Sequence, residues 1–118
     1  MPKVETVSEF LKTPLEERKK KSKVYLDNNP SKVPVLVESV EKEWEFEKSK
    51  FLLPKNFNIA KLALMVKQYK KSKEDEAMYI YAGNRIMRAD KLIGKIYEEY
   101  KEKDGFLYLR ISNVPSLG

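Results

Sequence analysis

The residue types that could carry chemistry in this chain are few. The 118-residue sequence contains no histidine and no cysteine, so it lacks the commonest general base and the strongest nucleophile. Its four glycines are scattered and form no phosphate-binding loop. Composition alone permits Ser-Lys catalysis, but the candidate pairs fall on predicted helix ends and loops: Ser22-Lys23, Ser31-Lys32, Ser49-Lys50 and Ser72-Lys73. We therefore predict a protein that is not an enzyme and uses no catalytic residue, metal or cofactor.

The charge balance indicates an acidic partner. The net charge is +6 and 36% of residues are charged, which favours nucleic acid, anionic lipid or an acidic peptide. Most basic residues are lysines, and arginine occurs only at positions 18, 85, 88 and 110. Because base-specific reading relies on arginine's fork, we expect generic attraction and no specific nucleic acid. A nucleic-acid-binding domain is the alternative that a steep salt dependence of duplex binding would support.

Two helices are predicted at the start of the chain. Thr6 and Glu9 have the spacing of a capping box that opens a short helix. Thr13 is expected to cap a second helix with Pro14 at its first position. This second helix should end at residues 25–26, with its lysines exposed.

The rest of the chain alternates strands and helices. Apolar runs predict strands at 33–40, 48–54, 77–82 and 106–112. Asn58 should cap a helix between the second and third strands, and Asp90 a shorter one before the last strand. Two strands, a crossing helix and two further strands make an α+β, ubiquitin-like β-grasp fold, with a mixed four-stranded sheet whose last strand lies beside the first. We expect a helical extension at 1–28, the β-grasp domain at 29–112 and a flexible tail at 113–118.

The motifs KVPVLVE, KSKFLLP and DGFLYLRIS, followed by a closing glycine, resemble those of the autophagy ubiquitin-like modifiers, the family of GABARAP. The resemblance covers about Leu15 to Gly118. It implies a protein that is cytoplasmic, and membrane-anchored on autophagosome-type vesicles once it has been lipidated. We expect the protein to be a monomer.

The resemblance implies that Gly118 is the conjugation residue. An activating enzyme would adenylate its carboxyl, a conjugating enzyme would receive it as a thioester, and an amide to phosphatidylethanolamine would follow. Glycine suits this role because it has no Cβ and leaves its carbonyl open to attack. The lipid's two acyl chains suffice for stable anchoring. A delipidating cysteine protease is a further implied partner, and whether the sequence is already the processed form stays open.

The resemblance also implies a groove that binds short W/F/Y-x-x-L/I/V segments of cargo receptors. The KFLLP strand would be a sheet edge to which the peptide adds as a strand, and nearby lysines such as Lys48 would attract its acidic flanks. The implied aromatic pocket comprises Lys21, Tyr25, Pro34, Leu36, Lys50, Leu52 and Phe106. The implied aliphatic pocket comprises Phe51, Leu53, Pro54, Phe57, Leu62 and Met65.

Apolar spacing by itself would place several of these side chains in an ordinary core. They are Phe51, Leu62, Met65 and Phe106. With the resemblance, we expect partial exposure for Tyr25, Lys50, Leu52 and Leu53.

The chain departs from the family pattern in places. The connection between the first two strands is shorter than in GABARAP, the helix end at 67–72 reads KQYKKS where the family has arginines, and Pro115 stiffens the tail. Two alternative functions stay open. One is a non-conjugated ubiquitin-like adaptor that binds peptides or tubulin, and the other is a modifier that is joined to protein lysines.

Overall fold

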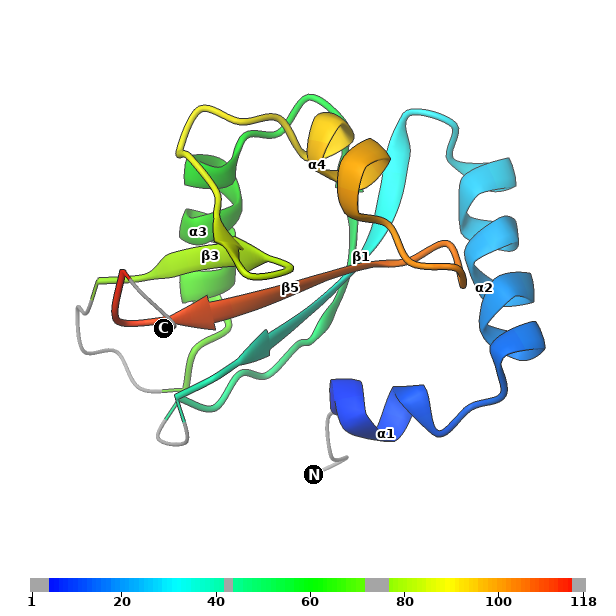
Figure 1. The fold of residues 1–118 in the computed structure, drawn as a ribbon, viewed down its shortest axis with the longest axis horizontal. Helices are drawn as coiled ribbons and strands as arrows, with labels where there is room; N and C mark the ends of the chain where they lie inside the picture. Colours follow the sequence, from blue (N-terminus) through cyan, green and yellow to red (C-terminus); the bar gives the residue numbers. More distant parts are fainter. Residues whose placement is uncertain (1–4, 42–43, 72–76, 116–118) are drawn as a thin grey trace.

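The computed structural model describes residues 5–41, 44–71 and 77–115, and the structural statements below concern these ranges. Two helices precede a body of strands and helices in the predicted α+β order (Figure 1). The elements are α1 (Val7–Leu11), α2 (Leu15–Asn28), β1 (Lys32–Ser39), β2 (Lys50–Pro54), α3 (Ile59–Gln68), β3 (Tyr79–Ala82), β4 (Arg85–Ile86), α4 (Ile93–Tyr100) and β5 (Leu107–Ser112).

The strands form one mixed sheet in the order β2-β1-β5-β3-β4. The last strand lies parallel to the first, with Val35 opposite Leu107, and the other neighbouring strands are antiparallel. The predicted position of β5 beside β1 is therefore confirmed. The sheet has one strand more than the four predicted, because the turn at Gly83 folds the two-residue β4 back onto β3.

The two faces of the sheet bury different side chains. Alternate residues of β1 and β5 pack against α3 and α4 in the main core, because successive strand residues point to opposite faces. This core includes Val33, Val35, Val37, Leu62, Val66, Ile93, Ile96, Leu107, Leu109 and Ile111. On the opposite face, α1 covers Leu36 and Phe106 with Val7 and Phe10. Figure 1 accordingly shows α1 and α2 on one side of the sheet and α3 on the other.

The N-terminal helices match the prediction only in part. The Thr6–Glu9 capping box is present in both directions. The prediction that Thr13 caps α2 is wrong, because Pro14 itself occupies the N-cap with an extended backbone and its carbonyl accepts from Arg18 N–H at 3.1 Å. The helix also continues to Asn28, beyond the predicted end at residues 25–26.

The two later helices begin in different ways. At α3, the Asn58 side chain accepts from the Lys61 N–H at 2.8 Å, as predicted. At α4, Asp90 is not the cap, because the helix begins after Leu92 and its first N–H groups find carbonyls of a neighbouring loop. The Ile93 N–H donates to the Phe57 carbonyl at 2.8 Å and the Gly94 N–H to the Lys55 carbonyl at 2.9 Å. Tertiary contacts thus replace the side-chain cap.

The connection between β1 and β2 contributes to the core. Trp44 is buried with 6% exposure, and Phe46 forms an isolated bridge with Lys70 just beyond α3. The Glu47 N–H donates to the Tyr69 carbonyl at 2.7 Å. This segment therefore anchors β2 to the end of α3 and fixes where the edge strand begins.

Candidate functional site

The strand β2 lies at the edge of the sheet and pairs with β1 alone among the described strands. Just beyond the ladder, the Val37 N–H donates to the Ser49 carbonyl at 2.8 Å. Hydrogen-bonded pairs alternate in an antiparallel ladder. Phe51 and Leu53, which lie opposite Val35 and Val33, therefore turn their backbone groups towards β1.

The remaining backbone groups of β2 point away from the sheet. By the same alternation, the N–H and C=O groups of Lys50 and Leu52 face the side where no strand of the described ranges lies. Their side chains are partly exposed, whereas those of Phe51 and Leu53 are buried. The predicted edge position of KFLLP is confirmed, and this edge can accept an added strand.

The residues implied for the aromatic pocket lie around the contact of α2 with the sheet. Lys21 and Tyr25 are exposed on α2, Lys50 and Leu52 are partly exposed on β2, and Pro34, Leu36 and Phe106 are buried. The rings of Tyr25 and Phe106 make an edge-on contact with centroids 6.3 Å apart. Residues that are distant in sequence are thus brought together next to the free edge.

Phe10 of α1 occupies the centre of this group, a position that neither its sequence neighbours nor the family resemblance predicts. Its ring is 1% exposed and meets Phe106 edge-on at 5.0 Å. The ammonium groups of Lys50 and Lys21 lie 4.5 and 5.7 Å from the Phe10 ring centroid. The spacing of Val7 and Phe10 on one helix face was the available signal, but it does not say which surface α1 covers.

The residues implied for the aliphatic pocket are divided between core and surface. Phe51, Leu53 and Leu62 are buried in the main core, while Pro54, Phe57 and Met65 are partly buried. The expectation that Leu53 is partly exposed is wrong, because its side chain faces the main core and is 1% exposed. A partner could therefore touch only the partly buried members.

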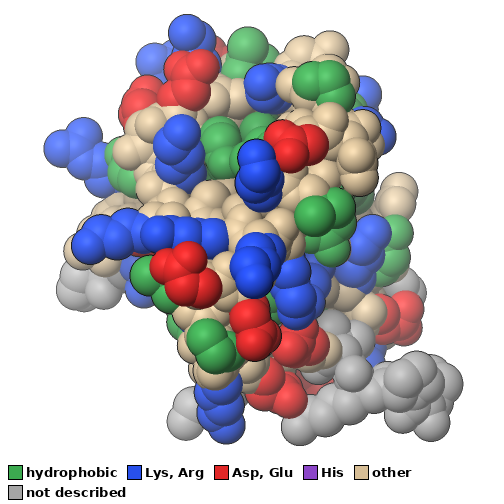
Figure 2. Space-filling model, turned by 90° about the vertical axis from the view of Figure 1, so that its right-hand side faces the viewer, with side chains coloured by type: hydrophobic (Ala, Val, Ile, Leu, Met, Phe, Trp, Pro, Cys, Tyr) green, Lys and Arg blue, Asp and Glu red, His purple; other side chains and the backbone are tan. Residues whose placement is uncertain are grey.

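Several lysines are already held by aromatic rings or carboxylates. The Lys48 ammonium lies 5.0 Å from the Phe51 ring centroid and 5.5 Å from that of Tyr69. Lys71 pairs with Glu45 at 3.0 Å, so this cation of the KQYKKS segment has an internal partner. The α2 lysines at positions 19, 20, 21 and 23 are exposed, and two of them form ion pairs within the helix, Lys19 with Glu16 at 3.7 Å and Lys23 with Asp27 at 3.5 Å. Figure 2 shows Lys and Arg side chains spread over this side of the molecule with acidic ones between them.

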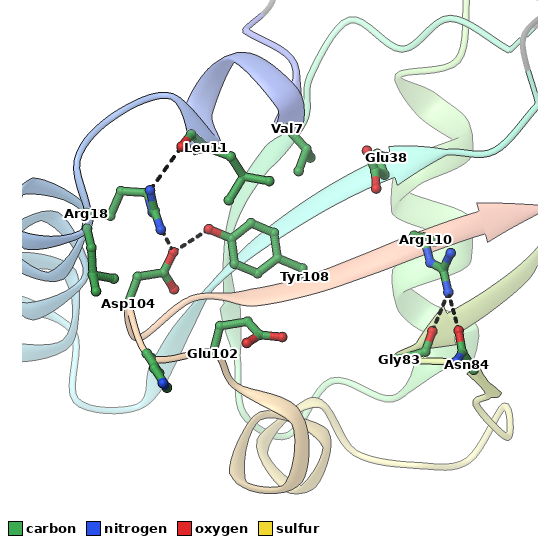
Figure 3. A pocket seen from close by; sticks show the side chains of 12 residues that line it. Val7, Leu11, Arg18, Glu38, Gly83, Asn84, Glu102, Asp104, Tyr108 and Arg110 are labelled. Carbon is green, nitrogen blue, oxygen red and sulfur yellow. Dashed lines mark hydrogen bonds and ion pairs between the residues drawn. The ribbon is translucent and has the colours of Figure 1, made fainter.

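A buried carboxylate ties α2 to the start of β5. Asp104 is 2% exposed. It accepts from Arg18 Nε at 3.0 Å, from the Phe106 N–H at 2.9 Å and from the Tyr108 hydroxyl. Figure 3 shows this group beside a cavity of about 550 Å³ whose walls include Val7 and Leu11 of α1. The network holds α2 against the sheet and so positions Tyr25 and Lys21.

The turn that carries Asp104 requires a glycine. Gly105 has a φ of 85°, and a Cβ at this position would lie 2.4 Å from Ser22 Oγ. The Ser22 hydroxyl in turn donates to the Asp104 carbonyl at 2.6 Å. The close approach of α2 to this turn therefore excludes a side chain at residue 105.

Alkaline pH tests the Asp104 network. Burial raises the pKa of Tyr108 above the ordinary value of 10.0, and its hydrogen bond to Asp104 and the negative charge there add to the effect. A group whose pKa is raised by folding stabilises the folded protein at pH values below its unfolded-state pKa. This stabilisation is lost as pH rises through the folded-state pKa. We therefore expect the free energy of unfolding to fall as pH increases above about 10.

The measurement is denaturant unfolding at pH 8 to 12, and the Tyr108→Phe variant should lose less stability over this range than the parent. Lysine titration affects both proteins alike, so the difference between their slopes isolates Tyr108. Tyr25→Phe, at a residue that is 41% exposed, is the control. Equal slopes for the parent and Tyr108→Phe would contradict the assignment.

The chain beyond β5 is fixed to the body for a short distance. Ser112 Oγ donates to a Glu41 carboxylate oxygen at 3.0 Å, which also accepts from the Asn113 N–H at 3.2 Å. The Tyr81 hydroxyl donates to the Val114 carbonyl at 2.8 Å. The tail expected from residue 113 is thus attached at its start, although the Val114 side chain is 46% exposed. The implied conjugation residue, Gly118, lies outside the described residues, and its role stays a prediction.

Neither a membrane span nor a metal cluster is found where the structure describes the chain. No helix of these ranges has the length and apolar character needed to cross a bilayer. Nor do they contain a group of three or more His, Cys, Asp or Glu side chains that could hold a metal ion.

These features define the class of the protein: a ubiquitin-like α+β domain with two leading helices and a free edge strand. The sequence matches the family described as "Autophagy protein Atg8 ubiquitin like" over residues 17–118, and the chain belongs to this Atg8 family. It is 32% identical to Autophagy-related protein 8D of Oryza sativa subsp. japonica over 107 residues, covering 88% of this chain and 91% of that protein. It is 29% identical to Autophagy-related protein 8d of Arabidopsis thaliana, covering 89% of each chain.

Solved structures agree on the fold. Trypanosoma brucei ATG8 superposes with a TM-score of 0.80 at 22% identity, covering 92% of this chain and 95% of that one. Plasmodium falciparum Atg8, solved in complex with a P. falciparum Atg3 peptide, superposes with a TM-score of 0.79 at 24% identity, covering 90% and 95%. Proteins of this family are ubiquitin-like modifiers and adaptors of autophagy that associate with autophagosomal membranes, and they are not enzymes.

Proposed function

We propose that this chain is an autophagy modifier with two working parts. The carboxyl of Gly118 is joined to phosphatidylethanolamine on autophagosomal membranes by an activating and a conjugating enzyme, and a cysteine protease removes the lipid. The free edge of the sheet then recruits cargo receptors that carry an aromatic-x-x-aliphatic segment. Membership of the Atg8 family supports the first part.

The observation that carries the second part is the outward-facing backbone of Lys50 and Leu52. An extended peptide can pair with these groups, because the strand β2 has no neighbour on this side in the described ranges. The partly exposed side chains next to the edge, Leu52 and Met65 among them, give alternate peptide side chains apolar contacts. P. falciparum Atg8 is solved with an Atg3 peptide, and we propose that a peptide of the conjugating enzyme binds this chain too.

Peptide binding is tested by reversing one charge at each edge of the sheet. In Lys50→Glu, an acidic-flanked peptide meets repulsion where it met attraction, and this outweighs the loss of the exposed, weak Lys50–Glu5 pair, so we expect binding about tenfold weaker, or ~1.4 kcal/mol, by calorimetric titration. Arg85→Glu makes the same change of charge on β4 at the opposite edge and should bind nearly as well as the parent. An equal loss in both variants would indicate generic attraction and remove the groove assignment.

Conjugation is tested by reconstitution with activating and conjugating enzymes, ATP and liposomes that contain phosphatidylethanolamine. We expect a mass increase equal to the lipid on the C-terminal peptide of the parent and none on Gly118→Ala. Lipid on Gly118→Ala at the parent's rate would contradict the role of Gly118. A mass measurement on protein from its native cells separates the alternatives, because a lysine-linked product indicates a protein-targeted modifier and an unmodified C-terminus indicates an adaptor.

A further inference from the structure

We propose that the segment from Glu5 to Phe10 is an internal competitor for the peptide groove, which is therefore closed until α1 is displaced. This inference rests on the proposed peptide-binding function and adds its regulation. The segment presents an aromatic ring and a carboxylate, which are the same two groups that the groove is proposed to take from a cargo receptor.

The ring of Phe10 lies where the partner's aromatic side chain is expected. It contacts Phe106 edge-on at 5.0 Å and belongs to one buried cluster with Leu36. The Lys50 ammonium lies 4.5 Å from its centroid. With 1% exposure, Phe10 leaves no room for a second ring in this cluster, because protein interiors are close-packed.

The carboxylate of Glu5 forms an ion pair with Lys50, the cation nearest to the Phe10 ring. It lies 2.5 Å from the Lys50 ammonium, and the Glu5 carbonyl accepts from the Ser49 hydroxyl at 2.6 Å. Lys50 and Ser49 stand at the start of the free edge. A peptide that brings an acidic residue to Lys50 must therefore replace Glu5 as well as Phe10.

The closing segment is weak enough to be displaced. The helix α1 has five residues, far fewer than the roughly 12–15 that a helix needs to persist alone in water, so its helical state depends on docking. The side chains of Lys50 and Glu5 are 40% and 41% exposed, and ion pairs at such exposure contribute little. Release of α1 exposes the Val7 and Phe10 side chains of the small cluster and breaks the contacts of Glu5, while the main core on the other face of the sheet stays intact.

In competition of this kind, the apparent dissociation constant equals the intrinsic one divided by the fraction of molecules that are open. If roughly one molecule in ten is open, a variant that cannot close should bind peptide about tenfold more tightly. The test is calorimetric titration of the full chain with an aromatic-x-x-aliphatic peptide whose flanks are uncharged. Uncharged flanks ensure that removing the Glu5 charge acts on closure and has no direct effect on the peptide.

Two variants and one control make the comparison. Phe10→Ala should bind about tenfold more tightly than the parent, and Glu5→Gln should gain less in the same direction. Glu98→Gln removes a carboxylate from an exposed site on α4 and should match the parent. Hydrogen exchange of the parent gives a second measurement: the Phe10 amide, which donates to the Thr6 carbonyl at 2.9 Å, should exchange faster when peptide saturates the protein.

The outcomes separate this inference from the proposed function. Equal affinities in all variants, with unchanged exchange of the Phe10 amide, would overturn the competition while peptide binding stands. Weaker binding by a folded Phe10→Ala would overturn it too, because Phe10 would then be part of the pocket. Absence of binding in the parent and in every variant would remove the groove itself. Should Phe10→Ala fail to fold, Glu5→Gln and the exchange measurement decide the question.

Discussion

The Asp104→Ala variant is expected to have a free energy of unfolding about 3–5 kcal/mol lower than that of the parent. The substitution leaves the Arg18 guanidinium, the Tyr108 hydroxyl and the Phe106 N–H without the acceptor that they share. Asp104 is 2% exposed and Arg18 15%, so water compensates little. Because domains of this size are stable by about 5–15 kcal/mol, the loss is a large share of the total.

Urea unfolding followed by circular dichroism measures this loss. Asp90→Ala is the matched control, since Asp90 pairs with Arg88 at 3.3 Å on the surface with 74% exposure, and such pairs contribute at most about 1 kcal/mol. Asp104→Asn should fall between the two, because an amide oxygen can still accept from Phe106. If Asp104→Ala costs no more than Asp90→Ala, the network does not hold α2 to β5.

The Leu52→Pro variant should bind a cargo-type peptide about 2–4 kcal/mol more weakly, or roughly 30- to 1,000-fold. Proline removes the one N–H of Leu52, which points to the free side, together with a leucine side chain next to the groove. No hydrogen bond to β1 is lost, because Leu52 lies opposite Pro34 and these two residues form one of the pairs without backbone hydrogen bonds between them. An edge strand accepts proline at such a position, so the free energy of unfolding should change little.

Peptide titration and urea unfolding of the same samples check both halves of this expectation. Leu52→Ala keeps the N–H and isolates the side chain, and Leu53→Pro removes a ladder N–H and should destabilise the fold. If Leu52→Pro binds as well as Leu52→Ala, the peptide does not use this N–H, and strand addition at β2 is contradicted.

The sequence predicted those features that local patterns determine. The Thr6–Glu9 box and the Asn58 cap depend on residues three positions apart, and the apolar runs indicated where β1 and β5 lie. The alternation along β2 correctly separated Phe51 from Lys50 and Leu52. The edge position of β2 and the residues proposed to line its groove came from a family resemblance, because no local pattern states which strand is outermost.

The features that were missed depend on contacts between distant residues. Asp90 has the sequence position of a helix cap, but the first N–H groups of α4 already donate to the carbonyls of Lys55 and Phe57. The partner of Arg18 lies 86 positions away, so Asp104 reads as a turn residue only. Phe10 shows apolar spacing, yet nothing in its neighbours says that it covers Phe106.

The hydrogen bond from the Tyr81 hydroxyl to the Val114 carbonyl holds the chain after β5 against the β3 side of the body. Residues 115–118 span at most about 14 Å when fully extended, so under the proposed function an enzyme acting on Gly118 would have to approach the β3 side of the body closely. After attachment to a headgroup, the same short tether would keep the globule against the bilayer. Since β5 and β1 lie between β3 and β2, the edge proposed to bind receptors lies roughly 14 Å across the sheet from this point of attachment, and a bound receptor and the lipid would therefore be held at different strands of one sheet.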